Sequence, residues 1–137
     1  MDIAFTSSDI WLLLSVALAE TEPPVTLVDV IAAGHAINKA VFTPQELRRG
    51  FSKLTRAGYA VDDAGAYSLT PAGREIVDRA RKAAPKWLEM WRKLEVELGA
   101  TRGTESDPRY EDVRFPYPQL TNEVVAEAVR HYTCRGT

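Results

Sequence analysis

The chain has 137 residues, of which 45% are hydrophobic and 26% charged, and this ordinary globular composition excludes a chain disordered throughout. Its formal net charge of −2 excludes a polycation that coats nucleic acid without sequence preference. One cysteine, Cys134, excludes an intramolecular disulfide, and the apolar run at residues 10–19 is too short to span a membrane, so we expect a cytoplasmic protein.

The first predicted helix covers residues 10–20 and follows several capping residues at 6–9. It is apolar most of the way round, which indicates burial on more than one side, and we expect the last helix of the chain to cover it. Residues 20–25 contain paired prolines, which end the helix and predict a short extended segment. Thr26 then caps a second predicted helix over residues 27–38.

The third predicted helix, residues 44–57, is the most strongly marked segment. Thr43 is a capping residue, Pro44 suits the first helical position, and Glu46 completes a capping box. Gly58 tolerates the left-handed conformation that ends helices. Residues 43–57 carry four Lys or Arg and one Glu, a net charge of +3, whereas residues 1–43 carry one Lys and five acidic residues, a net charge of −4.

The two faces of this helix differ. Leu47, Gly50, Phe51 and Leu54 recur at helical spacing on one side, which predicts a core face. The other side is polar and basic and consists of Gln45, Arg48, Arg49, Ser52, Lys53 and Arg56.

After Gly58 the pattern alternates through Tyr59 and Val61, turns at residues 62–65, and resumes at Tyr67 and Leu69, which predicts a short β-hairpin. Thr70 and Pro71 then start a fourth helix.

Apolar residues of this fourth segment advance in steps of three and four from Val77 to Leu98, as in a coiled-coil seam. Pro85 interrupts the seam, so the segment is either one kinked helix or two consecutive helices. The seam either packs on its own domain or joins two chains, and its tryptophans favour an interface. The predicted dimer residues are Trp87, Trp91, Leu94 and Leu98.

Residues 99–120 contain three prolines and two glycines without clean periodicity, which predicts a long loop. Residues 113–117 are apolar and aromatic and are expected to pack in extended conformation. Thr121 caps a predicted last helix with Val124, Val125, Ala128, Val129 and Tyr132 on its apolar face.

The predicted order of elements, with the sequence Tyr67-x-Leu69-Thr70-x-x-Gly73 at the end of the hairpin, resembles winged helix-turn-helix regulators of the PadR-like and MarR-like kind over residues 8–84. The resemblance implies a mainly α fold with a small hairpin, a winged helix-turn-helix domain at residues 1–84, and a helical extension with a long loop at 85–137. The extension would mediate dimerisation or pack on the first helix.

The resemblance also implies that the helix at 44–57 enters the major groove of double-stranded DNA. Gln45, Arg49, Ser52 and Arg56 would then face base edges, whereas Arg48 and Lys53 would contact phosphates. Two features depart from this family: the hairpin tip carries Asp62 and Asp63 in place of basic residues, and the connection from residue 38 to 43 is longer than a tight helix-turn-helix turn.

Catalytic and metal motifs give little support to other functions. His131 and Cys134 form a single ligand pair, which is too few for a metal site, and the carboxylates at 105–112 lie in a loop rather than in a predicted pocket. We therefore expect no enzyme, no cofactor and no metal. Two hypotheses remain: a homodimeric DNA-binding transcription regulator, or a winged-helix interaction module whose basic face receives an acidic protein partner.

Overall fold

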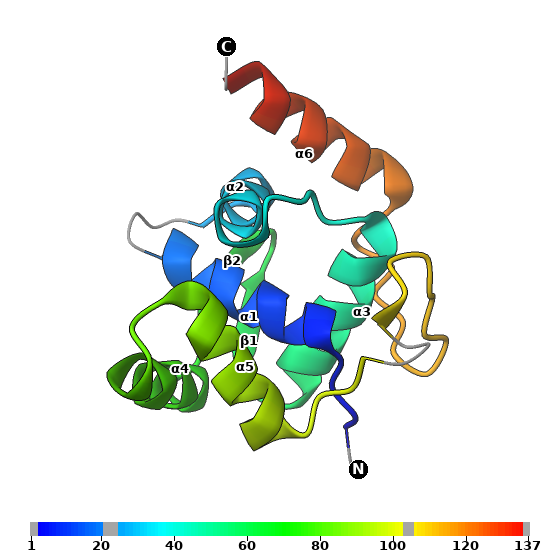
Figure 1. Cartoon of the computed structure of the whole chain (residues 1–137). Helices are drawn as coiled ribbons and strands as arrows, with labels where there is room; N and C mark the ends of the chain where they lie inside the picture. Colours follow the sequence, from blue (N-terminus) through cyan, green and yellow to red (C-terminus); the bar gives the residue numbers. More distant parts are fainter. Residues whose placement is uncertain (1–2, 21–24, 103–105, 136–137) are drawn as a thin grey trace.

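The computed structural model describes residues 3–20, 25–102 and 106–135. Within these residues it contains six helices and one two-stranded hairpin (Figure 1), so the expected mainly α fold with a small hairpin is confirmed. The predicted extended segment at 20–25 and the loop carboxylate Glu105 fall wholly or partly outside the described residues. The elements are α1 (Ser7–Ala19), α2 (Leu27–Asn38), α3 (Pro44–Arg56), β1 (Ala60–Asp63), β2 (Ala66–Leu69), α4 (Pro71–Ala83), α5 (Trp87–Leu98) and α6 (Asn122–Arg135).

Threonine caps set several of the helix starts. The hydroxyls of Thr26, Thr43 and Thr70 each accept a hydrogen bond from the backbone N–H three residues later. Thr121 does the same for α6 through the Val124 amide. These starts agree with the predicted ones because a cap depends on neighbouring residues alone.

The hairpin pairs β1 and β2 antiparallel, from Ala60 opposite Leu69 to Asp63 opposite Ala66. Its turn holds Ala64 and Gly65 at positive φ. An antiparallel bridge from Val25 to Tyr67 adds a further backbone pairing beside β2. The predicted hairpin is therefore confirmed.

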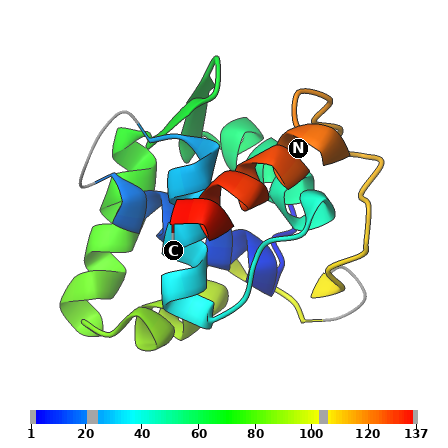
Figure 2. The ribbon, with the colours of Figure 1, turned by 90° about the horizontal axis from the view of Figure 1, so that it is seen from above.

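Helix α1 lies at the centre of the core. Ile10, residues 12–14 and Val16 have no exposed side-chain surface, and α1 packs against α2, α3 and α5. The expectation that the last helix covers α1 is wrong, because α5 fills that place: the Trp91 indole N–H donates to the Ser7 carbonyl at 3.0 Å, and the Trp91 ring stacks on Trp11. Helix α6 instead lies across α2 and contacts the N-terminal half of α3 (Figure 2).

Pro85 divides the predicted seam into two helices. Ala84 is extended, with φ −152° and ψ 99°, as the residue before a proline prefers. The chain then turns so that α4 and α5 pack on each other, and Arg79 of α4 forms an ion pair with Glu97 of α5. The segment is therefore two consecutive helices.

No helix among the described residues is both long enough and apolar enough to cross a bilayer.

Candidate functional site

The polar face of α3 is the candidate site that the sequence pointed to, and a segment of the same chain covers it. This segment, which we call the strap, comprises residues 106–121 between the end of the preceding loop and α6. Figure 1 shows it beside α3. Of the six predicted DNA-contacting residues, Arg56 is exposed, Gln45 and Arg48 are half-buried, and Arg49, Ser52 and Lys53 are buried.

The expected outward placement is therefore wrong for three of the six residues. Arg49 and Lys53 have no exposed surface and Ser52 is 1% exposed. The reason lies in the tertiary structure. Asp9 of α1 and the oxygen atoms of the strap face the side chains of Arg49, Ser52 and Lys53, so the polar side of α3 is covered by protein from two directions.

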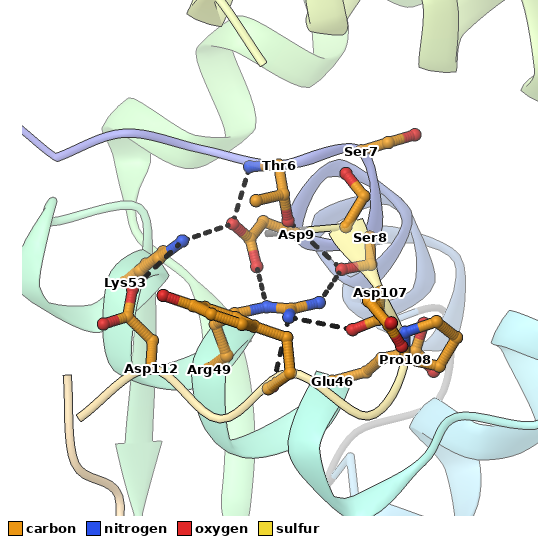
Figure 3. A network of polar contacts seen from close by, with 12 residues as sticks. Thr6, Ser7, Ser8, Asp9, Glu46, Arg49, Lys53, Asp107, Pro108 and Asp112 are labelled. Carbon is orange, nitrogen blue, oxygen red and sulfur yellow. Dashed lines mark hydrogen bonds and ion pairs between the residues drawn. The ribbon is translucent and has the colours of Figure 1, made fainter. Parts of the chain in front are cut away.

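Asp9 is the centre of a buried charge cluster (Figure 3). Its carboxylate lies 3.4 Å from Lys53 Nζ and 3.9 Å from Arg49 Nε, and all three side chains are fully buried. Asp9 also accepts a hydrogen bond from the Thr6 amide at 2.8 Å, as the acidic member of the α1 capping box. The same carboxylate therefore caps α1 and holds two cations of α3.

The strap completes this cluster. Asp112 lies 3.9 Å from Lys53 Nζ with its side chain 1% exposed. Arg49 donates to the Asp107 and Tyr110 carbonyls at 3.2 Å and to the Ser8 hydroxyl at 2.6 Å. Asp9 and Asp112 thus face Arg49 and Lys53. The buried carboxyl group of Glu46 also interacts with Arg49, and Arg114 pairs with Asp112 from the solvent side.

Other contacts fix the strap along the length of α3. Arg48 forms an ion pair with Glu111 and donates to the Leu120 carbonyl at 3.0 Å. At the N-cap of the helix, Thr43 donates to the Pro108 carbonyl, and about two turns further on Ser52 donates to the Pro116 carbonyl. The polar face of α3 is thus bonded to backbone and carboxylate oxygens over several turns.

Aromatic residues anchor the strap in the core. Phe115, Tyr117 and Leu120 are all buried. Tyr117 packs near the Phe51 ring of α3 and its hydroxyl donates to Asp62 of the hairpin. The expected packing of residues 113–117 is confirmed for Phe115 and Tyr117, whereas Val113 is exposed.

The two carboxyl groups of the cluster have pKa values displaced in opposite directions. Burial raises the pKa of Asp9, although Lys53, the Thr6 amide and Arg49 act in the other direction. Hydrogen bonds from the Arg114 side chain lower the pKa of Asp112. Neither acid was predicted to be buried, because Asp9 has the position of a helix cap and Asp112 lies in a predicted loop.

The four predicted dimer residues differ in burial: one is fully buried and three are half-buried. Leu94 is fully buried within its own chain, and Trp91 donates to Ser7 as described. Trp87 and Leu98 are half-buried against the core. Leu94 therefore packs in the core of its own chain. The homodimer stays a prediction.

Within the described residues, no group of three or more His, Cys, Asp and Glu side chains is arranged to hold a metal ion. His131 lies 3.1 Å from Glu127 on α6, and Cys134 is exposed.

No protein-family model, curated protein or solved structure matches this chain significantly.

Proposed function

We propose that the chain is a winged-helix protein-interaction module and that α3 does not read DNA with its polar face. The order α1, α2, α3, hairpin, α4 supports the winged-helix assignment, as does the Val25–Tyr67 bridge, which supplies the short third strand of such folds. Gly73, the last residue of the Tyr67-x-Leu69-Thr70-x-x-Gly73 motif, packs directly on the Tyr59 backbone. The close contact between α4 and the start of the hairpin therefore explains why the motif ends in glycine.

The single observation that carries the functional proposal is the burial of Arg49, Ser52 and Lys53. Direct readout requires side-chain donors to reach base edges in the major groove. Here these donors are directed into the protein: Arg49 and Lys53 form ion pairs with Asp9, and Arg49 and Ser52 donate hydrogen bonds to Ser8 and to the strap. A winged helix whose third helix is covered in this way retains its other surfaces for partners.

Displacing the strap would not by itself free the two central cations. Asp9 belongs to the capping box of α1, and α1 is the most deeply buried helix of the core. Arg49 and Lys53 would keep their contact with Asp9 after the strap had moved, since an uncompensated buried carboxylate costs several kcal/mol.

The hairpin tip supports the same proposal. Asp62 and Asp63 are the charged residues of the β1–β2 hairpin, and Asp63 is exposed. Carboxylates at this position repel the phosphates that a wing would approach.

The DNA-binding regulator is the second candidate, and one observation favours it. Arg56 is exposed, and Arg48, although paired with Glu111, keeps part of its surface accessible. Two cations on one helix suffice for phosphate contacts, which give affinity without sequence readout.

Selection from a random duplex library with the purified protein separates the two candidates. For an interaction module we expect no enriched motif and only weak binding that disappears as salt rises. The matched variant is Arg48→Ala with Arg56→Ala, which removes the two accessible cations of α3 and does not alter Asp9, Arg49 or Lys53. An enriched palindrome that binds the wild-type protein, and that this folded variant no longer binds, would establish the regulator instead.

A further inference from the structure

The surface groove between α4 and α5 has a different character from the covered face of α3. It has a volume of about 560 Å³ and is lined by Arg79, Ala80, Ala83, Arg92, Lys93, Val96 and Glu97. Alanines on α4 leave room for another chain to approach closely, because their side chains end at Cβ. On α5, Val96 is 84% exposed. A large apolar side chain this accessible at the edge of a groove is suited to contact a partner.

The groove lies in a strongly basic segment, and its own lining carries Arg79, Arg92 and Lys93 against Glu97. Residues 79–93 contain six Lys or Arg and one Glu, a net charge of +5 in a chain of net charge −2. Arg79 is paired with Glu75 and Glu97, and Arg81 with Asp78. Within the described residues, Lys82, Lys86, Arg92 and Lys93 have no carboxylate at ion-pair distance, and all four are exposed.

Two of these four cations lie where a ligand in the groove would meet them. Arg92 and Lys93 line it together with Val96, on one face of α5. Leu88, one turn before Arg92, is 55% exposed. It lines an adjacent pocket that shares Arg92 with the groove, so it extends the apolar stripe beyond the groove itself. The stripe therefore alternates exposed apolar side chains with cations that have no internal partner.

We propose that this groove binds an acidic amphipathic helix of a partner protein. The apolar face of such a helix would cover Ala83, Val96 and Leu88, and its carboxylates would pair with Arg92 and Lys93. A helix in a groove formed by two others is a common recognition mode, and charge complementarity selects an acidic partner over a basic one. This assignment rests on the proposed function, for which it names the partner class and the surface.

A second copy of this chain fits the groove less well. In a two-fold symmetric contact the residues nearest the axis meet their own equivalents. Arg92 and Lys93 would then face Arg92 and Lys93 across the interface, and like charges in contact are unfavourable. The charge of the groove therefore favours a partner of opposite charge.

The test selects binders from a phage-displayed library of random peptides of about 16 residues, roughly 24 Å long as a helix. The full chain is the bait, and synthetic copies of enriched peptides are measured by fluorescence anisotropy. We expect acidic amphipathic sequences whose affinity falls at least about tenfold for Arg92→Glu with Lys93→Glu, and likewise for Val96→Asp. Lys39→Glu with Arg109→Glu makes the same charge change at two exposed positions outside the groove and should leave affinity unchanged. Circular dichroism confirms that each variant folds.

Each other outcome has a distinct meaning. Enriched peptides that bind all variants equally would overturn the groove while leaving the interaction module standing. Absence of peptide binding, together with an enriched DNA motif, would overturn the proposed function and the groove together. Duplex binding that is lost only in Arg92→Glu with Lys93→Glu would reassign the groove to nucleic acid. Sedimentation that shows a dimer dissociated by Val96→Asp would reassign it to self-association.

Discussion

Lys53 of α3 and Asp9 of α1 form an ion pair of 3.4 Å in which neither side chain is exposed to solvent. The pair joins the helix expected to read DNA to the capping box of the central helix. It also explains why a basic residue on the polar side of an amphipathic helix is buried: its partner comes from a segment 44 residues earlier, with Asp112 from a third segment.

Asp9→Asn should lower the free energy of unfolding by about 3–5 kcal/mol, because it leaves Arg49 and Lys53 buried with one carboxylate fewer. Urea denaturation monitored by tryptophan fluorescence measures this change. Asp78→Asn, which alters an exposed ion pair on α4, is the matched control and should change stability by less than about 1 kcal/mol. Equal effects of the two substitutions would contradict a structural role for the cluster.

Gly73→Ala should destabilise the fold by about 1–3 kcal/mol, as overpacking does. A Cβ at this position would lie 2.1 Å from the Tyr59 carbonyl oxygen, and that carbonyl is held by the Thr70 amide. Thermal denaturation measures the loss. Lys82→Ala on the exposed side of α4 is the control; a Gly73 variant as stable as this one would show that the contact relaxes freely.

Stability should depend on pH through Asp112. Hydrogen bonds from Arg114 lower the pKa of Asp112 in the folded state below its ordinary value of 3.8, so the unfolded chain binds the proton more readily. The resulting stabilisation is present above that value and is lost as pH falls through the folded-state pKa.

The check compares wild type with Asp112→Asn in urea denaturation between about pH 6 and pH 2. Wild type should lose unfolding free energy more steeply toward acid than the variant does. The raised pKa of Asp9 acts in the opposite sense in both proteins, so the difference between the two curves, rather than either curve alone, reports on Asp112. Parallel curves would refute the role of Asp112.

Leu94→Ala should cost about 2–5 kcal/mol, as for other fully buried leucines, because Leu94 lies in the core of its own chain. Val96→Ala on the same helix should change stability by less than about 0.5 kcal/mol, since Val96 is mostly exposed. Chemical denaturation at several protein concentrations makes the measurement. A Leu94 effect that depends on protein concentration would instead place this residue in a dimer interface.

The amino-acid sequence by itself determined the local elements of this protein. The caps at Thr26, Thr43 and Thr70, the hairpin turn at 62–65 and the break at Pro85 all lie where short-range patterns predicted them. These features depend on backbone hydrogen bonds and dihedral preferences within a few residues, which a sequence displays directly.

Only the tertiary structure decided what faces each helix. The polar side of α3 has the same composition whether water, DNA or protein lies against it, so its charge pattern alone could not reveal Asp9, Asp112 and the strap. For the same reason the seam residue Leu94 turned out to pack on its own core, with α5 rather than α6 covering α1. Long-range pairing brings together groups that are distant in the chain, and the buried ion pair between Lys53 and Asp9 exists only because the fold supplies both partners.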